Sequence, residues 1–215
     1  MGARLGCGGR FVKRLVVASG NPGKLGEIRA LLAPLGIEAV SQGELGIADA
    51  EEPHFTFLEN ALAKARHASG ASGLPALADD SGLCVDALGG EPGVNSAHFA
   101  GREGSREERD GRNNAKLLDA IARESVGSVH YAAHYACVMV LVRHAADPQP
   151  LVAEGNWRGV ITDRPRGSNG FGYDPLFLLP GLGKTAAELG ATEKNRVSHR
   201  GIALQRLLQR LREEG

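Results

Sequence analysis

The feature that most constrains the fold is a short apolar run that leads into a glycine-rich turn and then into helical periodicity. The apolar run covers residues 15–18, and the turn is Ser19-Gly20-Asn21-Pro22-Gly23. Apolar side chains then recur at three- and four-residue spacing as far as Leu35, the pattern of one helix face. Asn21 can cap this helix, and Pro22 suits its first position. A strand, a glycine turn and a helix in this order are typical of an α/β unit.

The remainder of the chain alternates between helical and strand patterns. Thr56 and Glu59 have capping-box spacing, and the helix they predict has an apolar face made of Phe57, Leu58, Ala61, Leu62 and Ala65. Further helices are predicted over residues 105–123 and 201–212, and strands over residues 76–78, 131–143, 151–162 and 173–179. Residues 147–150 are predicted to form a turn between neighbouring strands. We therefore expect one α/β domain over residues 14–215, with a mixed β-sheet flanked by helices.

Composition narrows the class of protein. At 215 residues the chain can bury a proper core, and its 25 basic residues are balanced by 25 acidic ones. This balance argues against a general nucleic-acid binder, which usually carries a basic excess. No apolar run approaches the length of about 18–20 residues that spans a bilayer, so we expect no membrane partner.

The N-terminus and the cysteines indicate where the protein works. Residues 1–13 are basic and glycine-rich without a long apolar stretch, which predicts a disordered extension and argues against a secretory signal. The three cysteines, Cys7, Cys84 and Cys137, lack the spacing of a metal site. Reduced thiols in a cytoplasmic protein are the interpretation that this pattern favours.

The turn at residues 19–24 is a candidate anion site. Its spacing fails the P-loop pattern, because two residues separate the glycines and Leu25 stands where a serine or threonine is required. The backbone N–H groups at the positive end of a helix nevertheless favour a phosphate, and Lys24 adds a full charge. The alternative is a plain strand-to-helix turn with a solvated lysine.

Acidic residues form a second candidate. Asp79 and Asp80 follow the predicted strand over residues 76–78 and precede a Ser81-Gly82 turn. Carboxylates in such a place can hold Mg²⁺ through oxygen, although an aspartate that caps local backbone is an open alternative. The pair Glu51-Glu52 could fold beside them. Because successive strand residues point to opposite faces, we expect only one of the two aspartates to look directly into the site.

Two later segments complete the set. Phe171 stands between two glycines, so its ring could serve as a stacking platform for a base, or it could be a core residue beside a bulged strand. Several ionisable groups lie within residues 193–200, just before the last predicted helix, and Ser198 can cap that helix. This density of cations suits an anionic ligand, although a solvated helix entry would look the same. We interpret Trp157 as a packing residue.

Taken together, these segments closely resemble the family of inosine/xanthosine triphosphate pyrophosphatases. The stretches that carry the resemblance are SGNPGK (19–24), EEPHFTFLENALAKA (51–65), ADDSGLCVDALGGEPGVNSAHFAG (78–101), GFGYDPLF (170–177) and EKNRVSHRGIAL (193–204). The resemblance spans about residues 14–212, in the family's order, and is nearest to its bacterial branch. Ser19 stands where a threonine is common, and the hydroxyl is kept.

The resemblance implies roles for the matching residues. It implies that the triphosphate is held by Ser19, Gly20, Asn21, Pro22, Gly23 and Lys24, and that Ser81 touches the substrate. Asp80 would bind magnesium and act as the catalytic base, with Glu51 as the favoured acidic partner and Glu52 as the alternate. Asp79 would then turn away from the phosphate site and serve in support, by bonding nearby backbone. Phe171 would stack the base, in a pocket lined by Gly172, Tyr173 and Asp174. Contacts to phosphate or to the purine edge would come from Lys194, His199 and Arg200.

The resemblance also implies an activity. It implies magnesium-dependent hydrolysis of non-standard purine nucleoside triphosphates, namely ITP, dITP and XTP, to the monophosphate and pyrophosphate. Proteins of this kind are homodimers, with an elongated mixed sheet between two α/β lobes and an active-site cleft between the lobes. Two rival readings are a related pyrophosphatase acting on modified pyrimidine nucleotides and a non-enzymatic nucleotide sensor or RNA-binding module. The clustered carboxylates argue against RNA, because acidic pairs repel a polyanion.

Overall fold

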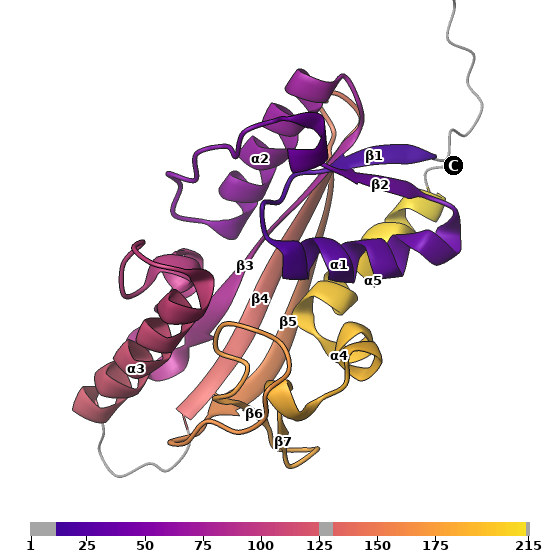
Figure 1. Cartoon of the computed structure of the whole chain (residues 1–215). Coiled ribbons are helices and arrows are strands. Elements are labelled where there is room, and N and C mark those ends of the chain that lie inside the picture. Colours follow the sequence, from indigo (N-terminus) through magenta and orange to yellow (C-terminus); the bar gives the residue numbers. More distant parts are fainter. Residues whose placement is uncertain (1–11, 125–130, 214–215) are drawn as a thin grey trace, which may run out of the picture.

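The structure, a computed structural model, describes residues 12–124 and 131–213 of the chain. In this part, seven strands form one sheet in the order β2-β1-β3-β4-β5-β6-β7 (Figure 1). The strands are β1 (Arg14–Val17), β2 (Glu38–Ser41), β3 (Ala76–Val85), β4 (Tyr131–Val142), β5 (Leu151–Ile161), β6 (Phe177–Leu179) and β7 (Lys184–Thr185). β1 is parallel to both of its neighbours, and the pairs from β3 to β7 are antiparallel. The predicted mixed sheet is thus confirmed.

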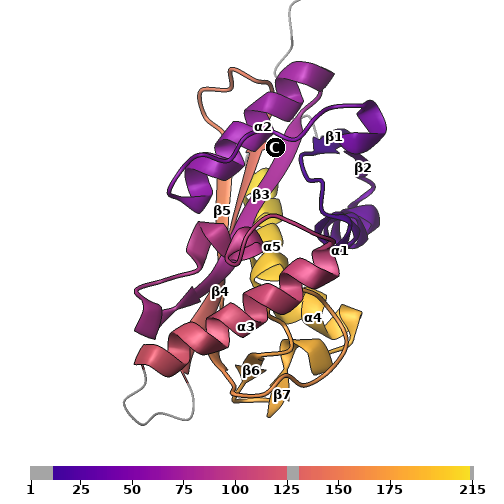
Figure 2. The same cartoon turned by 60° about the vertical axis from the view of Figure 1, so that its left-hand side comes forward.

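Helices cover both faces of the sheet, as Figures 1 and 2 show. They are α1 (Pro22–Leu32), α2 (Phe57–Ser72), α3 (Arg106–Glu124), α4 (Ala191–Val197) and α5 (His199–Glu213). The alternation along β3 assigns the faces, because Ala76 and Ala78 pack with α2 whereas Leu77 packs with α1 and α5. The flanked α/β fold that the sequence predicts is therefore the observed one.

Local capping explains where the first two long helices begin. Asn21 is the N-cap of α1, and its side chain accepts from the backbone N–H groups of Gly23 and Lys24. Thr56 caps α2 by accepting from the backbone N–H of Glu59. Both predicted starts are confirmed. The predicted apolar face of α2 is wrong at one position, because Leu58 is 42% exposed.

The course of β3 differs from the prediction. The strand does not end at residue 78 but continues to Val85, and the two aspartates pair with β4 opposite Met139 and Val138. Gly82 is a strand residue rather than a turn residue. A Cβ added there would lie 2.2 Å from the carbonyl oxygen of Gly93. The glycine is needed because another backbone segment approaches the strand closely at this point.

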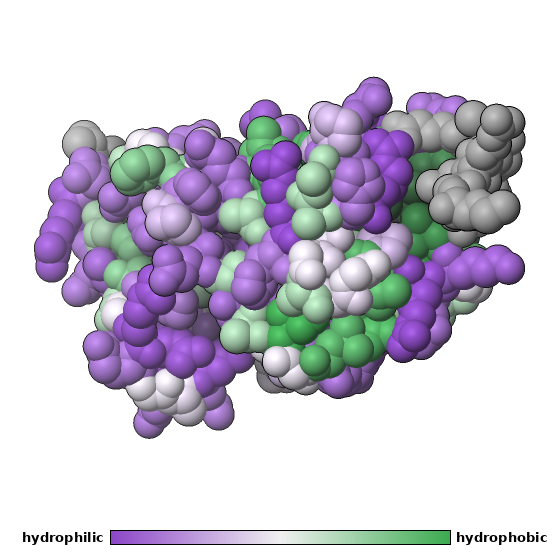
Figure 3. All heavy atoms as spheres, turned by 90° about the horizontal axis from the view of Figure 1, so that it is seen from above, coloured by the Kyte–Doolittle hydropathy of each residue, from purple (hydrophilic) through white to green (hydrophobic). Residues whose placement is uncertain are grey.

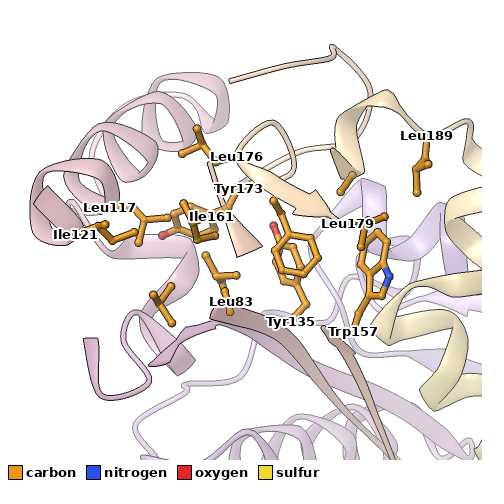
Figure 4. Packing of buried hydrophobic residues seen from close by; sticks show 14 residues of the cluster. Leu83, Leu117, Ile121, Tyr135, Trp157, Ile161, Tyr173, Leu176, Leu179 and Leu189 are labelled. Carbon is orange, nitrogen blue, oxygen red and sulfur yellow. The ribbon is translucent and has the colours of Figure 1, made fainter. Parts of the chain in front are cut away.

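The predicted strand over residues 173–179 is largely wrong. Only Phe177–Leu179 is extended, and Tyr173 instead begins a turn in which its carbonyl accepts from the N–H groups of Leu176 and Phe177. Tyr173 and Leu176 are nonetheless buried, in a cluster that also contains Trp157 (Figure 4). Burial of apolar side chains in a turn gives the same sequence pattern as a buried strand. The interpretation of Trp157 as a packing residue is confirmed.

Other expectations concern the ends and the surface. Most of the predicted extension over residues 1–13 lies outside the described residues. Of its described part, Val12 packs against the sheet and Lys13 accepts a hydrogen bond from Glu38. Among the described residues, no helix has both the length and the apolar character needed to cross a bilayer. Figure 3 shows one face as mainly hydrophilic with an apolar area on it. The predicted two lobes and cleft stay predictions.

Candidate active site

The candidate phosphate loop, which we define as residues 19–24, comprises part of the turn after β1 and the first three residues of α1. Asn21 Oδ1 accepts from the backbone N–H groups of Gly23 at 2.9 Å and Lys24 at 3.2 Å. Ser19 Oγ accepts from the N–H of Asn21 at 3.2 Å. These bonds fix the loop at the positive end of an 11-residue helix. The loop therefore has the polarity that an anion requires.

Asp79 is fully buried and joins the phosphate loop to the C-terminal part of the chain. Its Oδ2 lies 3.1 Å from Lys24 Nζ and 3.3 Å from Arg200 Nε, and it accepts from Ser81 Oγ at 3.1 Å. Burial alone would raise the pKa of Asp79, but the charges of Lys24 and Arg200 outweigh it and hold the pKa well below its usual range. The expectation that Asp79 turns away from the phosphate site and bonds nearby backbone is wrong, because its carboxylate faces Lys24 and Arg200 and its partners are side chains.

Asp80 points to the other face of β3, toward α2. Asn60 Nδ2 donates to its Oδ2 at 3.2 Å, and Lys64 Nζ lies 3.0 Å from its Oδ1. Burial is the main cause that raises the pKa of Asp80, against the lowering effect of Lys64 and Lys24. The two carboxylates thus occupy opposite sides of the strand, as its geometry requires.

Glu52, rather than Glu51, is the acidic residue that the structure links to Asp80. Lys64 Nζ lies 3.1 Å from Glu52 Oε2 and 3.0 Å from Asp80 Oδ1, so one ammonium joins the two carboxylates. Glu51 is exposed. In the described ranges no three acidic, histidine or cysteine side chains converge in the manner of a metal site. By chemistry, the oxygen donors of Asp80 and Glu52 suit Mg²⁺.

The ring of Phe171 lies directly against the phosphate loop. A Cβ added to Gly23 would stand 2.8 Å from Cε1 of that ring, so only glycine leaves room for this approach. The backbone N–H of Phe171 donates to Asp174 Oδ2 at 2.9 Å. Gly170 and Gly172 on either side both have positive φ, of 77° and 64°. The candidate base platform and the candidate phosphate loop are therefore in contact.

Three cations surround the Phe171 ring. The distances to the ring centre are 4.3 Å from the guanidinium carbon of Arg106, 5.0 Å from Lys194 Nζ and 6.0 Å from the guanidinium carbon of Arg200. Lys194 also lies 2.6 Å from Asp174 Oδ2. The structure thus brings together the predicted residues of four separate segments.

Two predicted residues lie elsewhere. The His199 ring is buried and stacked on Tyr135, with 4.7 Å between ring centres, and burial holds its pKa well below the usual value. A charged contact to phosphate does not fit this environment, and a contact from the neutral ring to the purine edge stays a prediction. The Tyr173 side chain points into the core, where its hydroxyl donates to the carbonyl of Ser96 (Figure 4).

Several residues of the site were missed by the sequence analysis. Lys64 and Asn60 are buried on α2, four residues apart, and a charged residue on a predicted buried face was a usable signal. Glu27 pairs with Arg200 and lies 3.8 Å from Lys194. Arg106 had no local signal, because its helix looks solvated in the sequence.

The fold and the site together define an α/β protein with a buried, charge-paired centre beside a candidate anion site at the start of α1. Sequence comparison refines this class. The Ham1 family profile matches residues 15–210, and the chain belongs to this family. It is 62% identical over 201 residues to the dITP/XTP pyrophosphatase of Ralstonia nicotianae, with 94% of this chain and 98% of the relative covered. Identity to the dITP/XTP pyrophosphatase of Nitrosomonas europaea is 60%, with 94% and 96% covered.

Solved structures agree with this assignment. The HAM1 protein of Coxiella burnetii is 45% identical and superposes with a TM-score of 0.84, over 93% of this chain and 98% of that one. The Ham1 protein of Staphylococcus aureus is 36% identical with a TM-score of 0.80, over 94% and 100%. The fold of the whole described domain is therefore that of the Ham1 family.

Proposed function

We propose that this chain hydrolyses non-standard purine nucleoside triphosphates, such as ITP, dITP and XTP, to the nucleoside monophosphate and pyrophosphate. The observation that carries the proposal is the contact between the phosphate loop and the Phe171 ring, with Lys24, Lys194 and Arg200 around it. A nucleotide needs one place for its phosphates and one for its base, and these two are adjacent. Relatives at 60% identity and above bear the name dITP/XTP pyrophosphatase.

The residues divide the chemistry between them. Water attacks the α-phosphorus, the bond to the β-phosphate breaks, and pyrophosphate leaves. The triphosphate carries about four negative charges, which Lys24, Lys194, Arg200 and the N-terminus of α1 would offset. Asp80 would take the proton of the attacking water. Asn60 and Lys64 hold its two oxygens in place, and burial raises its pKa, which makes the carboxylate a better proton acceptor.

Magnesium belongs to this proposal. Asp80 would hold the ion with Glu52, which shares Lys64 with it, or with Glu51 as the resemblance implies. When bound, Mg²⁺ neutralises phosphate charge and lowers the pKa of a bound water. Activity should disappear in EDTA and return when Mg²⁺ is added in excess. Full activity in the chelator would contradict this part.

Base selection follows from hydrogen bonding. The 6-oxo group of hypoxanthine or xanthine is an acceptor, whereas adenine presents an amino donor at the same place. Cationic donors at the site would be left unpaired by adenine, and such a mismatch can cost a factor of about 10⁴. We expect kcat/KM to be highest for ITP, dITP and XTP in a panel that includes ATP and 5-methyl-UTP. A preference for 5-methyl-UTP would instead indicate a pyrophosphatase that acts on modified pyrimidine nucleotides.

The remaining proposals concern the assembly and the compartment. We propose a homodimer that works in the cytoplasm on a small-molecule substrate, without a nucleic-acid or membrane partner. Large apolar side chains that are exposed in the described part of the monomer include Leu45, Phe55 and Leu58. Burial of such side chains between two subunits would favour dimer formation. Light scattering at micromolar concentration should give twice the mass of the 22.6 kDa chain; a monomer mass would contradict the dimer.

A further inference from the structure

Arg106, the first residue of α3, lies between the phosphate loop and Phe171. Its Nη1 donates to Asn21 Oδ1 at 2.7 Å, and its guanidinium carbon is 4.3 Å from the centre of the Phe171 ring. One side chain from α3 therefore contacts both the candidate phosphate site and the candidate base platform. The side chain is 36% exposed, so the guanidinium has room to change its partner.

The charge of Arg106 is less well balanced than that of its neighbours. Lys24 lies 3.1 Å from a buried carboxylate and Lys194 lies 2.6 Å from another. Among the residues that the structure describes, the carboxylate within 4.0 Å of Arg106 is Asp110, at 3.9 Å. That same Asp110 oxygen also accepts from the N–H of Gly172 at 2.9 Å. Arg106 thus keeps most of its positive charge available.

The hydrogen bond from Arg106 to Asn21 is also a weak one. Asn21 Oδ1 already accepts from two backbone N–H groups of the loop, so Arg106 is a third donor to one amide oxygen. The guanidinium additionally lies near the N-terminus of α1, where the helix dipole disfavours a cation. An anion bound at the loop would remove both unfavourable features, the shared acceptor and the repulsion by the helix dipole. It would offer ionised acceptors, and it would neutralise the helix end.

We propose that Arg106 is a further substrate-binding residue, which exchanges the Asn21 amide oxygen for a phosphate oxygen of the substrate. The planar fork of a guanidinium matches a phosphate group, and charge-assisted hydrogen bonds are stronger than the amide bond that is lost. In moving, the guanidinium leaves the face of Phe171 and opens that ring to the base. This inference rests on the proposed function, because it takes residues 19–24 as the phosphate site.

The test separates the two halves of the substrate. Dissociation constants are measured for inorganic triphosphate, which has no base, and for inosine, which has no phosphate, with Mg²⁺ in excess. The variants are Arg106→Ala and Arg106→Lys. The matched control is Arg109→Ala, because Arg109 lies on the same helix, carries the same charge and donates to the carbonyl of Gly104. This control measures the effect of removing one positive charge from α3 while the contact between Arg106 and the loop is kept.

The expected result is a loss confined to the phosphate probe. Arg106→Ala should weaken binding of inorganic triphosphate about tenfold, in the range of one charge-assisted hydrogen bond, and should leave inosine binding unchanged or tighter. Arg106→Lys should recover part of the loss, and Arg109→Ala should resemble the wild type. The KM for ITP should rise in Arg106→Ala more than kcat falls.

Three outcomes would overturn the inference. Unchanged binding of inorganic triphosphate by Arg106→Ala would show that Arg106 does not contribute to phosphate binding. A loss for inosine alone would assign the guanidinium to the base. Equal losses for both probes, together with a lower melting temperature, would make it a structural contact between α3 and the loop. Failure of the proposed function is seen separately, as a wild-type protein that binds triphosphate but does not hydrolyse ITP.

Discussion

At the scale of single residues, two adjacent carboxylates have different duties because strand geometry points them to opposite faces of β3. Asp79 is buried between Lys24 and Arg200 and holds both cations in place. Asp80 faces α2, where Lys64 contacts it, and burial raises its pKa. The first arrangement is that of a positioning residue. We propose that the second provides the carboxylate that accepts a proton from the attacking water.

The two environments predict that replacing Asp80 mainly lowers kcat, whereas replacing Asp79 mainly lowers stability. Asp80→Asn keeps the shape of the side chain but removes the proton acceptor, so kcat should fall at least about a hundredfold. Asp79→Asn leaves Lys24 and Arg200 without their buried partner, so the free energy of unfolding should fall by about 3 kcal/mol. Its kcat should fall less than that of Asp80→Asn. Measuring kcat and melting temperature for both decides the point. An inactive Asp79→Asn beside an active Asp80→Asn would reverse the assignment.

Phe171 is a second residue whose role can be separated from packing. Its ring is partly buried against Gly23 and three cations, whereas the Phe177 ring is fully buried in the core. Phe171→Ala should weaken substrate binding by about 1–3 kcal/mol, the usual value of base stacking, with little change in melting temperature. Phe177→Ala is the control and should lose several degrees. A similar loss of melting temperature in both variants would make Phe171 a core residue.

At the scale of elements, the starts of α1 and α2 could be predicted from sequence because capping is a local interaction. The course of β3 could not, because Asp79 to Gly82 are residue types that favour turns when no partners are known. In the fold, pairing with β4 and the buried cations keep this segment extended. The role of Arg106 was hidden for a related reason, since only the fold brings α3 against the phosphate loop.

The first residue of α5 makes stability depend on pH. Burial lowers the pKa of His199 well below its ordinary value of 6.5, so the folded protein keeps the ring neutral while the unfolded chain binds a proton below about that pH. Stability is therefore present above pH 6.5 and is lost as the pH falls, by up to about 1.4 kcal/mol per pH unit for this group. Unfolding free energies from pH 8 to 5 should show a shallower decline in His199→Gln.

The control for this prediction is His144→Gln, because His144 is exposed at the end of β4. Its unfolding free energies are measured over the same pH range. If His199→Gln declines as steeply as the wild type does, the folded protein protonates His199, and the neutral aromatic stack with Tyr135 is contradicted.

At the scale of the whole molecule, the site depends on segments from both ends of the chain. Lys24 of the phosphate loop and Arg200 of α5 both contact Asp79. The Phe171 ring, from the segment between β5 and β6, lies against Gly23 of the same loop. Sequence motifs could indicate that these segments contain functional residues. The contacts between the segments could not be predicted, because they depend on the order of the strands in the sheet. We propose that this assembled site cleaves a nucleoside triphosphate between the α- and β-phosphates.

The most direct test of this claim is the identity of the products. Wild-type protein is incubated with ITP and Mg²⁺, and the products are followed by phosphorus NMR. We expect inosine monophosphate and pyrophosphate in equal amounts, with no inosine diphosphate formed at any time. Release of orthophosphate together with inosine diphosphate would place the cleaved bond between the β- and γ-phosphates and would contradict cleavage at the α-phosphorus.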